Sequence, residues 1–170
     1  IAAVKDETGL AAALKSECEV IFLLFGSVVN IPDLVERVEE HLQRERCCGI
    51  KLYPGYNRIA LTDPIYEPLY ALAAQYKKPV AVHMGLTAHP RAYLKYCHPL
   101  ALDEAAADHP DTHFVMCHFG NPFLDAAAAV VEKNPNVSAD LSGLLEGPVD
   151  LEDYFSRQAG YLSLLRTWLT

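Results

Sequence analysis

Short apolar runs rich in β-branched residues alternate along the chain with longer stretches in which apolar residues recur at helical spacing. Most of the short runs are bounded by Gly, Pro, Asn or Asp. Most are also apolar on both faces, which is typical of parallel strands covered on both sides. These runs predict strands at residues 1–4, 20–25, 49–53, 79–83, 112–118 and 136–140.

The stretches between these runs predict helices. Several of them open with proline, which the first turn of a helix accepts readily. Pro68 lies inside one of them, and we expect it to delay the start of that helix or to kink it. Helices are predicted at residues 6–15, 32–44, 64–76, 99–107, 122–132 and 151–169. The alternation of strands and helices indicates an α/β fold with a parallel sheet.

The length of 170 residues fits one domain, over residues 1–170. An open, doubly wound sheet can be built from about six strands. A closed (β/α)8 barrel uses eight βα units and typically ~250 residues. Length alone therefore favours the open sheet, whereas the motifs at the strand ends favour part of a barrel.

Composition and charge narrow the classes of function. Apolar residues make up 51% of the chain and charged residues 21%, which excludes intrinsic disorder as the main state. The net charge of −8 argues against nucleic acid and anionic membrane surfaces as partners, because binding to both depends on Lys and Arg. The five cysteines show no C-x-x-C spacing, which is typical of free thiols, so we expect a reducing, cytoplasmic location.

Two strand ends carry the strongest chemical signal. His83 and His118 each end a predicted strand, and each is followed two residues later by glycine. The carboxyl ends of parallel strands meet at one edge of a sheet, where active sites gather. Neutral imidazole is a common zinc ligand and the usual general base near neutral pH. The alternative is that each histidine only bonds a nearby carbonyl, but two in the same register favour function.

Further residues at the strand ends are candidates for binding and positioning. Lys51 and Tyr53 share one face of a predicted strand, and a lysine inside a buried strand is costly unless it is paired or functional. We expect Lys51 to bind a substrate carboxylate or to be a modified metal ligand; it could also reach solvent from the strand start. Asp140 is expected to orient a histidine or to cap a turn. Arg91, in the loop after His83, is expected to clamp an anion or to be an ordinary surface residue.

Four segments at the predicted strand ends form a recognisable series. They are GIKLYP at 49–54, PVAVHMG at 79–85, VMCHFG at 115–120 and NVSADLSG at 136–143. In this order and spacing, the chain from about residue 39 to residue 170 resembles the amidohydrolase-2 family of metal-dependent hydrolases, which includes decarboxylases. The resemblance implies a (β/α)8 barrel and a divalent metal, with zinc as the first choice. It also implies that His83 is a metal ligand and that His118 is a second ligand or the general acid/base.

Two features of that family are missing from the sequence. No His-x-His occurs anywhere, and the aspartate that the family carries on its last strand in a Gly-Ser/Thr-Asp context is absent. We therefore expect a partial barrel of about six βα units, with an incomplete metal site and little activity in this chain alone. The open edges of such a sheet predict self-association into a homo-oligomer.

The first part of the chain resembles a different family. Segments IAAVKD at 1–6, EVIFLLFG at 19–26 and NIPDLV at 30–35 are similar to the start of the glycerol-3-phosphate-responsive antiterminator, which is also a βα barrel and binds RNA. The resemblance implies a chimera or fragment with a seam near residues 38–46. It also implies an alternative function as a non-enzymatic regulatory barrel.

The leading hypothesis is a metal-dependent hydrolase or decarboxylase that acts on a small carboxylate or amide. In this hypothesis His83 and His118 hold the metal, His118 and Asp140 are catalytic, and three residues bind substrate. The substrate-binding residues are Lys51, Tyr53 and Arg91.

Overall fold

The computed structural model describes residues 2–4, 21–23, 31–45, 47–144 and 150–169, together with Thr8, Ala12 and Lys15. In these residues the strands are all parallel to their neighbours and form one sheet of two strands and one of four, ordered as in the chain. Each predicted strand is confirmed, and those predicted at 49–53, 79–83, 112–118 and 136–140 are shortened by one to three residues. The strands are β1 (Ala2–Val4), β2 (Ile21–Leu23), β3 (Ile50–Leu52), β4 (Val80–His83), β5 (Phe114–Cys117) and β6 (Val137–Ala139).

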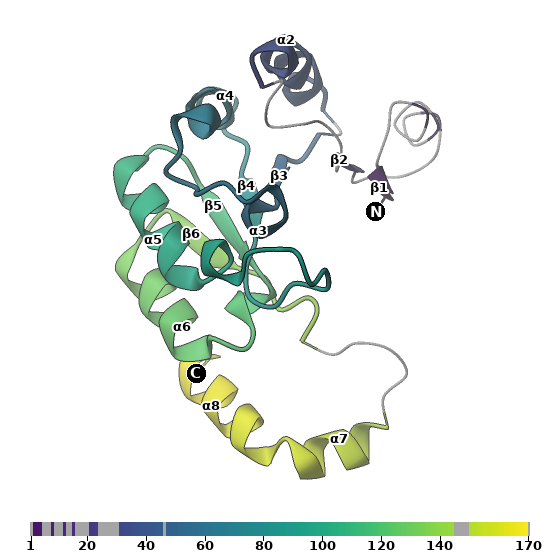
Figure 1. Ribbon diagram of the computed structural model, residues 1–170, viewed down its shortest axis with the longest axis vertical. Coiled ribbons are helices and arrows are strands. Elements are labelled where there is room, and N and C mark those ends of the chain that lie inside the picture. Colours follow the sequence, from purple (N-terminus) through teal and green to yellow (C-terminus); the bar gives the residue numbers. More distant parts are fainter. Residues whose placement is uncertain are drawn as a thin grey trace.

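Helices connect the strands, as Figure 1 shows. The helix predicted at 6–15 lies outside the described residues, apart from three helical positions. The described α-helices are α2 (Ile31–Leu42), α3 (Pro54–Asn57), α4 (Glu67–Gln75), α5 (Pro99–Asp108), α6 (Leu124–Lys133), α7 (Leu151–Arg157) and α8 (Ala159–Leu169). Short 3-10 turns add η2 (Pro64–Tyr66), η3 (Leu94–Tyr96) and η4 (His118–Gly120).

Two predicted helices differ from the observed ones by more than one or two residues at an end. The helix predicted at 64–76 begins with the 3-10 turn η2, and α4 starts only at Glu67, because Pro68 fits the first turn of an α-helix and not its interior. The helix predicted at 151–169 is two helices. The chain leaves helical geometry at Gln158, where φ is −105° and ψ is 22°, although the apolar periodicity continues through it.

The four-stranded sheet has one buried face and one partly open face. Alternate residues such as Val80, Val82, Phe114 and Met116 are all 0% exposed and pack against α4, α5 and α6, which lie together on one side of the sheet (Figure 1). This is the outer face of a barrel-type α/β layer. The residues between them point to the opposite face, the inner face, where Lys51, His83 and Val115 are half-buried and Cys117 is buried.

The arrangement is a partial (β/α)8-type barrel. Residues of β2 contact β3, so the two-stranded sheet lies beside the four-stranded one and continues its strand order. No helix in the described ranges is long and apolar enough to span a membrane. No disulfide joins the cysteines in the part of the chain that the structure describes.

Candidate active site

The candidate residues meet on the inner face, at the carboxyl ends of the strands. Lys51 lies in β3, His83 ends β4, and Cys117 ends β5 and pairs in register with His83. Because successive side chains on a strand point to opposite faces, the buried residues that alternate with these three fix them on the inner face. His83 ends its strand as expected, but the strand predicted at 112–118 ends at Cys117, and His118 begins the 3-10 turn η4 that follows.

His83 and His118 are in direct contact. The Nε2 of His118 lies 3.2 Å from the Nδ1 of His83, and the two rings meet edge to face with their centroids 4.9 Å apart. The other nitrogen of each ring contacts a backbone carbonyl oxygen. The Nε2 of His83 lies 2.9 Å from the oxygen of Leu86, and the Nδ1 of His118 lies 2.8 Å from that of Ser142.

These contacts assign the tautomer of each neutral ring. A carbonyl oxygen only accepts hydrogen bonds, so the nitrogen that faces it carries the proton. The Nε2–H of His83 therefore donates to Leu86, and the Nδ1–H of His118 donates to Ser142. The two remaining nitrogens present lone pairs to each other at 3.2 Å, an arrangement that favours a cation between them.

The surroundings of His83 keep it neutral. Burial lowers the pKa of His83 to about 4, with further lowering from His118 and Lys51, against the opposing hydrogen bond to Leu86. The ring of Tyr53 stacks on His83 at 5.4 Å, and Tyr56 meets it edge-on at 5.5 Å. Near neutral pH the imidazole therefore offers a free lone pair, which is the form that binds metal ions.

The turn after β6 holds His118 in an unusual backbone conformation. His118 has φ 64° and Phe119 has φ 44°, both in the left-handed region that residues with side chains seldom adopt. A carboxylate oxygen of Asp140 accepts hydrogen bonds from the His118 N–H (2.9 Å), the Ser142 N–H (2.9 Å) and the Ser142 hydroxyl. Burial opposes ionisation of Asp140, but these hydrogen bonds hold its pKa below the ordinary value.

Ser142 and Gly143 complete this turn, and our sequence reasoning missed both. The Oγ of Ser142 lies 3.0 Å from the Nδ1 of His118, in addition to the carbonyl contact. A Cβ on Gly143, where φ is 67°, would lie only 2.7 Å from that same nitrogen. The signal was present as Asp140-Leu141-Ser142-Gly143, a composition typical of a tight turn in which the aspartate accepts local backbone N–H groups.

Lys51 reaches across β4 to Cys117 on β5. Its Nζ lies 2.6 Å from the Cys117 Sγ and 5.1 Å from the centre of the Tyr53 ring. Burial raises the pKa of the Cys117 thiol to about 11, although the nearby Lys51 acts in the opposite direction. Burial also raises the pKa of the Tyr53 hydroxyl. A cation, a thiol and a phenol ring therefore line the inner face next to the histidine pair.

Comparison with known protein families places this site in context. A family model described as Amidohydrolase matches residues 8–167, nearly the whole chain. The chain belongs to the amidohydrolase family. The match runs without a break across residues 38–46 and covers most of residues 1–38, and no comparison supports the expected likeness to the antiterminator.

One solved structure supports the TIM-barrel fold of this amidohydrolase chain. The chain is similar to an uncharacterized TIM-barrel protein from Bordetella bronchiseptica, at 19% identity and a TM-score of 0.55, over 81% of this chain and 48% of that one. A dihydroorotase from Campylobacter jejuni aligns at 14% identity and a TM-score of 0.46, over 82% of this chain and 51% of that one. The chain thus spans about half the length of either protein. Among curated proteins, none matches.

Members of the amidohydrolase family generally use divalent metals, so we tested whether the residues present fit one. A tetrahedral ion bound at about 2.0–2.1 Å holds two nitrogens roughly 3.3 Å apart. The observed 3.2 Å between the facing nitrogens of His83 and His118 agrees with that value. Within the described ranges, however, no group of three His, Cys, Asp or Glu side chains is placed to hold a metal ion. The described side chains here that could bind a divalent metal are thus those of His83 and His118.

The structure does not bring Arg91 into this amidohydrolase site. Arg91 is exposed, and its hydrogen bonds are made by its backbone. Its carbonyl oxygen accepts a hydrogen bond from the Arg58 Nε (3.0 Å), and its N–H donates one to the His89 Nδ1 (3.1 Å). No described interaction joins its guanidinium to the residues of the inner face. Arg58, which sequence reasoning missed, lies over the Tyr93 ring at 4.8 Å in the same loop cluster.

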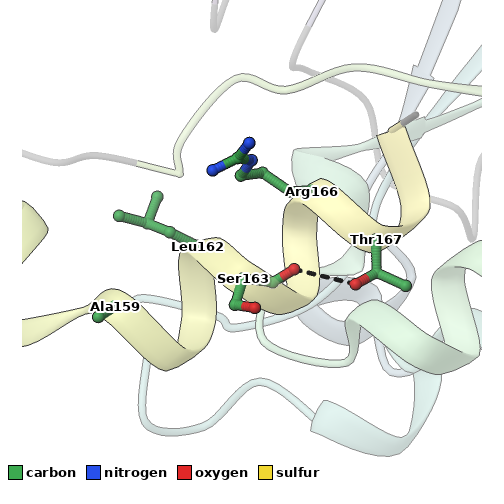
Figure 2. A pocket seen from close by; sticks show the side chains of 5 residues that line it. All are labelled: Ala159, Leu162, Ser163, Arg166 and Thr167. Carbon is green, nitrogen blue, oxygen red and sulfur yellow. Dashed lines mark hydrogen bonds between the residues drawn. The ribbon is translucent and has the colours of Figure 1, made fainter.

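A separate hollow of about 410 Å³ lies along α8 (Figure 2). All of its lining residues come from that one helix: Ala159, Leu162, Ser163, Arg166 and Thr167. Inside it, the Thr167 hydroxyl donates to the Ser163 carbonyl, an ordinary contact within a helix. None of the strand-end residues lines it, so it is not a candidate active site.

Proposed function

We propose that this amidohydrolase is a metal-dependent hydrolase or decarboxylase acting on a small carboxylate or amide substrate. His83 and His118 are the proposed metal ligands. Asp140 positions His118 through its backbone N–H, and Lys51 with Tyr53 faces the substrate. Zinc is the proposed metal, since imidazole suits it well, although imidazole also binds other divalent metals.

One observation carries this proposal, namely the two imidazole nitrogens that face each other at 3.2 Å. Each ring is oriented by a carbonyl oxygen behind it, the arrangement that typically supports metal-binding histidines. Two neutral bases that repel each other across a short gap gain most from a shared cation. A pair of histidines that only capped strands would not need this alignment.

The chain's own residues have distinct tasks in the proposed reaction. A bound divalent metal lowers the pKa of its water to about 7 and polarises a carbonyl or carboxylate. His83 binds through its Nδ1, and His118 either binds through its Nε2 or holds a proton at that atom. The carboxylate of Asp140 and the carbonyl of Ser142 keep the His118 ring in the required tautomer.

Lys51 is the proposed partner of the substrate anion. It projects from the inner face of β3, and no carboxylate among the described residues forms an ion pair with it. An ammonium group there attracts a carboxylate toward the histidine pair. In that pair, His83 ends the neighbouring strand β4 and His118 follows β5. Tyr53 stacks on His83 and forms a flat wall beside it. Arg91 remains a prediction with no contact that supports it.

Metal titration tests the proposal. We expect the metal-stripped chain to bind Zn²⁺ through this pair, with a binding free energy well below the about 10–16 kcal/mol of closed structural zinc sites, because the described ligands number two. His83→Ala and His118→Ala should each abolish the calorimetric signal. His89→Ala, in an exposed loop of the same protein, is the matched control and should leave it unchanged. Equal binding by all three variants contradicts the proposed ligands.

Two further expectations remain proposals. We treat residues 1–170 as one domain, since the family match spans it almost completely. We also propose that the sheet edges permit association into a homo-oligomer. Light scattering over a range of protein concentrations tests the second point, and a constant monomer mass contradicts it.

A further inference from the structure

The contact between Lys51 and Cys117 is closer than a hydrogen bond requires. The Nζ–Sγ distance is 2.6 Å. Nitrogen–oxygen hydrogen bonds run from about 2.7 to 3.2 Å, and sulfur is a larger atom than oxygen. The two atoms are therefore held against each other, and the cause lies in the sheet.

The register of the strands explains this approach. Lys51 pairs with Ala81 on β4, and Cys117 lies on β5, one strand further along. Ala81 leaves the space above β4 open, so the lysine side chain lies across it and ends at the sulfur. The Tyr53 ring, 5.1 Å from the Nζ, restricts the ammonium on its other side. The strand register thus places the two residues on the same face of the sheet, two strands apart, and the half-buried lysine side chain spans β4 to reach the sulfur.

We propose that Lys51 and Cys117 form an oxidative modification site, at which dioxygen joins them through a nitrogen–oxygen–sulfur bridge. An N–O bond and an O–S bond that share one oxygen hold the nitrogen and the sulfur at a separation of this size. The cross-link therefore needs no movement of either strand, whereas backbone movement is the usual obstacle to covalent cross-linking. The bridge does not depend on the proposed metal or on any substrate.

The reaction balances with dioxygen as the oxidant. One N–H bond of the lysine amine and the S–H bond of the cysteine break, while one N–O and one O–S bond form. One oxygen atom remains in the bridge, and the other leaves as water with the two hydrogens; the ammonium form also releases one proton. Four reducing equivalents from two dithiol molecules restore amine, thiol and water, so the bridge is reversible, unlike a sulfonic acid.

Cys97 provides a matched control within the same chain. Cys97 and Cys117 are 0% and 4% exposed, and both have a pKa raised by burial. Of these two thiols, Cys117 has a lysine nitrogen in contact with its sulfur, whereas Cys97 faces the backbone of Gly55. A difference in oxidation chemistry between the two thiols therefore reports on the lysine and not on burial.

Peptide mass spectrometry of the folded full chain tests the proposal. After incubation in air-saturated buffer and digestion without reductant, we expect the peptide with Lys51 joined to that with Cys117, about 14 Da above their summed mass (one oxygen gained, two hydrogens lost). Dithiothreitol should remove the species, and anaerobic handling should prevent it. Lys51→Arg and Cys117→Ser should lack it, whereas Cys97→Ser should keep it.

One outcome of the same experiment contradicts the proposal. If Cys117 in the oxidised, folded wild-type chain is found only as thiol, disulfide, sulfinic or sulfonic acid, without a link to Lys51, the proposal is wrong. This measurement uses the wild-type protein, so its result is valid even if a variant fails to fold.

Discussion

The two faces of the four-stranded sheet are built from the same strands but have different roles. On the outer face, Val82 and Met116 are completely buried under helices. On the inner face, Lys51 and His83 are only partly covered and contact other polar or aromatic groups. The period of two along each strand separates the residues that stabilise the fold from those available for chemistry.

This difference shows how the site acquires its geometry. The outer face fixes where each strand lies, since close packing leaves little freedom there. The inner face then presents its side chains at set positions without contributing much to stability. The exception is the turn at Asp140–Gly143, where hydrogen bonds and a missing Cβ shape the backbone around His118.

The largest expected effect on stability comes from a substitution that disrupts the packing on the outer face. Phe114→Ala should lower the free energy of unfolding by about 3–5 kcal/mol, because a fully buried ring is replaced by a cavity. Val115→Ala, on the inner face of the same strand, is the control and should cost less than about 1.5 kcal/mol. Urea denaturation measures both. Equal losses would show that the two faces do not differ in this way.

Gly143→Ala tests the turn that supports the inner face. The new Cβ meets the His118 ring and sits at positive φ, so we expect a loss of about 1–2 kcal/mol in stability. Metal affinity should fall roughly 10–100-fold, as when a group supporting a metal ligand is lost. Gly160→Ala, with nothing within 4 Å of its added Cβ, should be neutral or slightly stabilising. Unchanged metal affinity in Gly143→Ala contradicts the positioning role.

The helix layer over the outer face offers a pH-dependent test. Asp103 on α5 accepts hydrogen bonds from Lys133 (2.7 Å) and Asn134 (2.7 Å), and these contacts, led by Lys133, lower its pKa. A depressed carboxyl pKa adds stability above the unfolded value of 3.8, and that stability is lost as the pH falls through the lower folded value. Asp103→Ala should cost about 1 kcal/mol at pH 7. Denaturation curves of mutant and wild type should converge below pH 3.8, and a constant gap would contradict this account.

The smallest effect is expected from Lys51→Met. This change keeps the side-chain length and removes a charge that has no carboxylate partner among the described residues, so stability should stay within about 0.5 kcal/mol of wild type. Chemical denaturation provides the measurement. A loss above about 2 kcal/mol would show that the inner face also belongs to the stabilising core.

Much of the fold could be predicted from sequence because the strands carry strong apolar runs. All six predicted strands are present, and Pro68 delays its helix as expected. That His83 and His118 lie together could also be predicted, since both lie where a predicted strand ends. Their register could not, because β5 ends at Cys117, which pairs with His83, and His118 contacts His83 from the turn that follows. These predictions depend on local pattern and on parallel topology, which the sequence expresses directly.

The remaining features depend on contacts between distant segments. Helix α3 (Pro54–Asn57) is too short to show a period, and the break at Gln158 leaves the apolar repeat intact. The role of Ser142 depends on a ring 24 positions away in the chain. The proposed anion clamp at Arg91 stays a prediction, since it rests on loop position and charge, and the described contacts of Arg91 are made by its backbone.

The left-handed backbone at His118 and Phe119 also links the site to folding thermodynamics. Such conformations cost about 1–3 kcal/mol each and persist only where the native surroundings impose them. The unfolded chain therefore does not present the paired imidazoles, and an ion that binds them binds the folded state alone. By mass action, each tenfold excess of that ion over its dissociation constant adds about 1.4 kcal/mol to stability. A thermal melt across a series of metals thus ranks their fit to this site without any substrate.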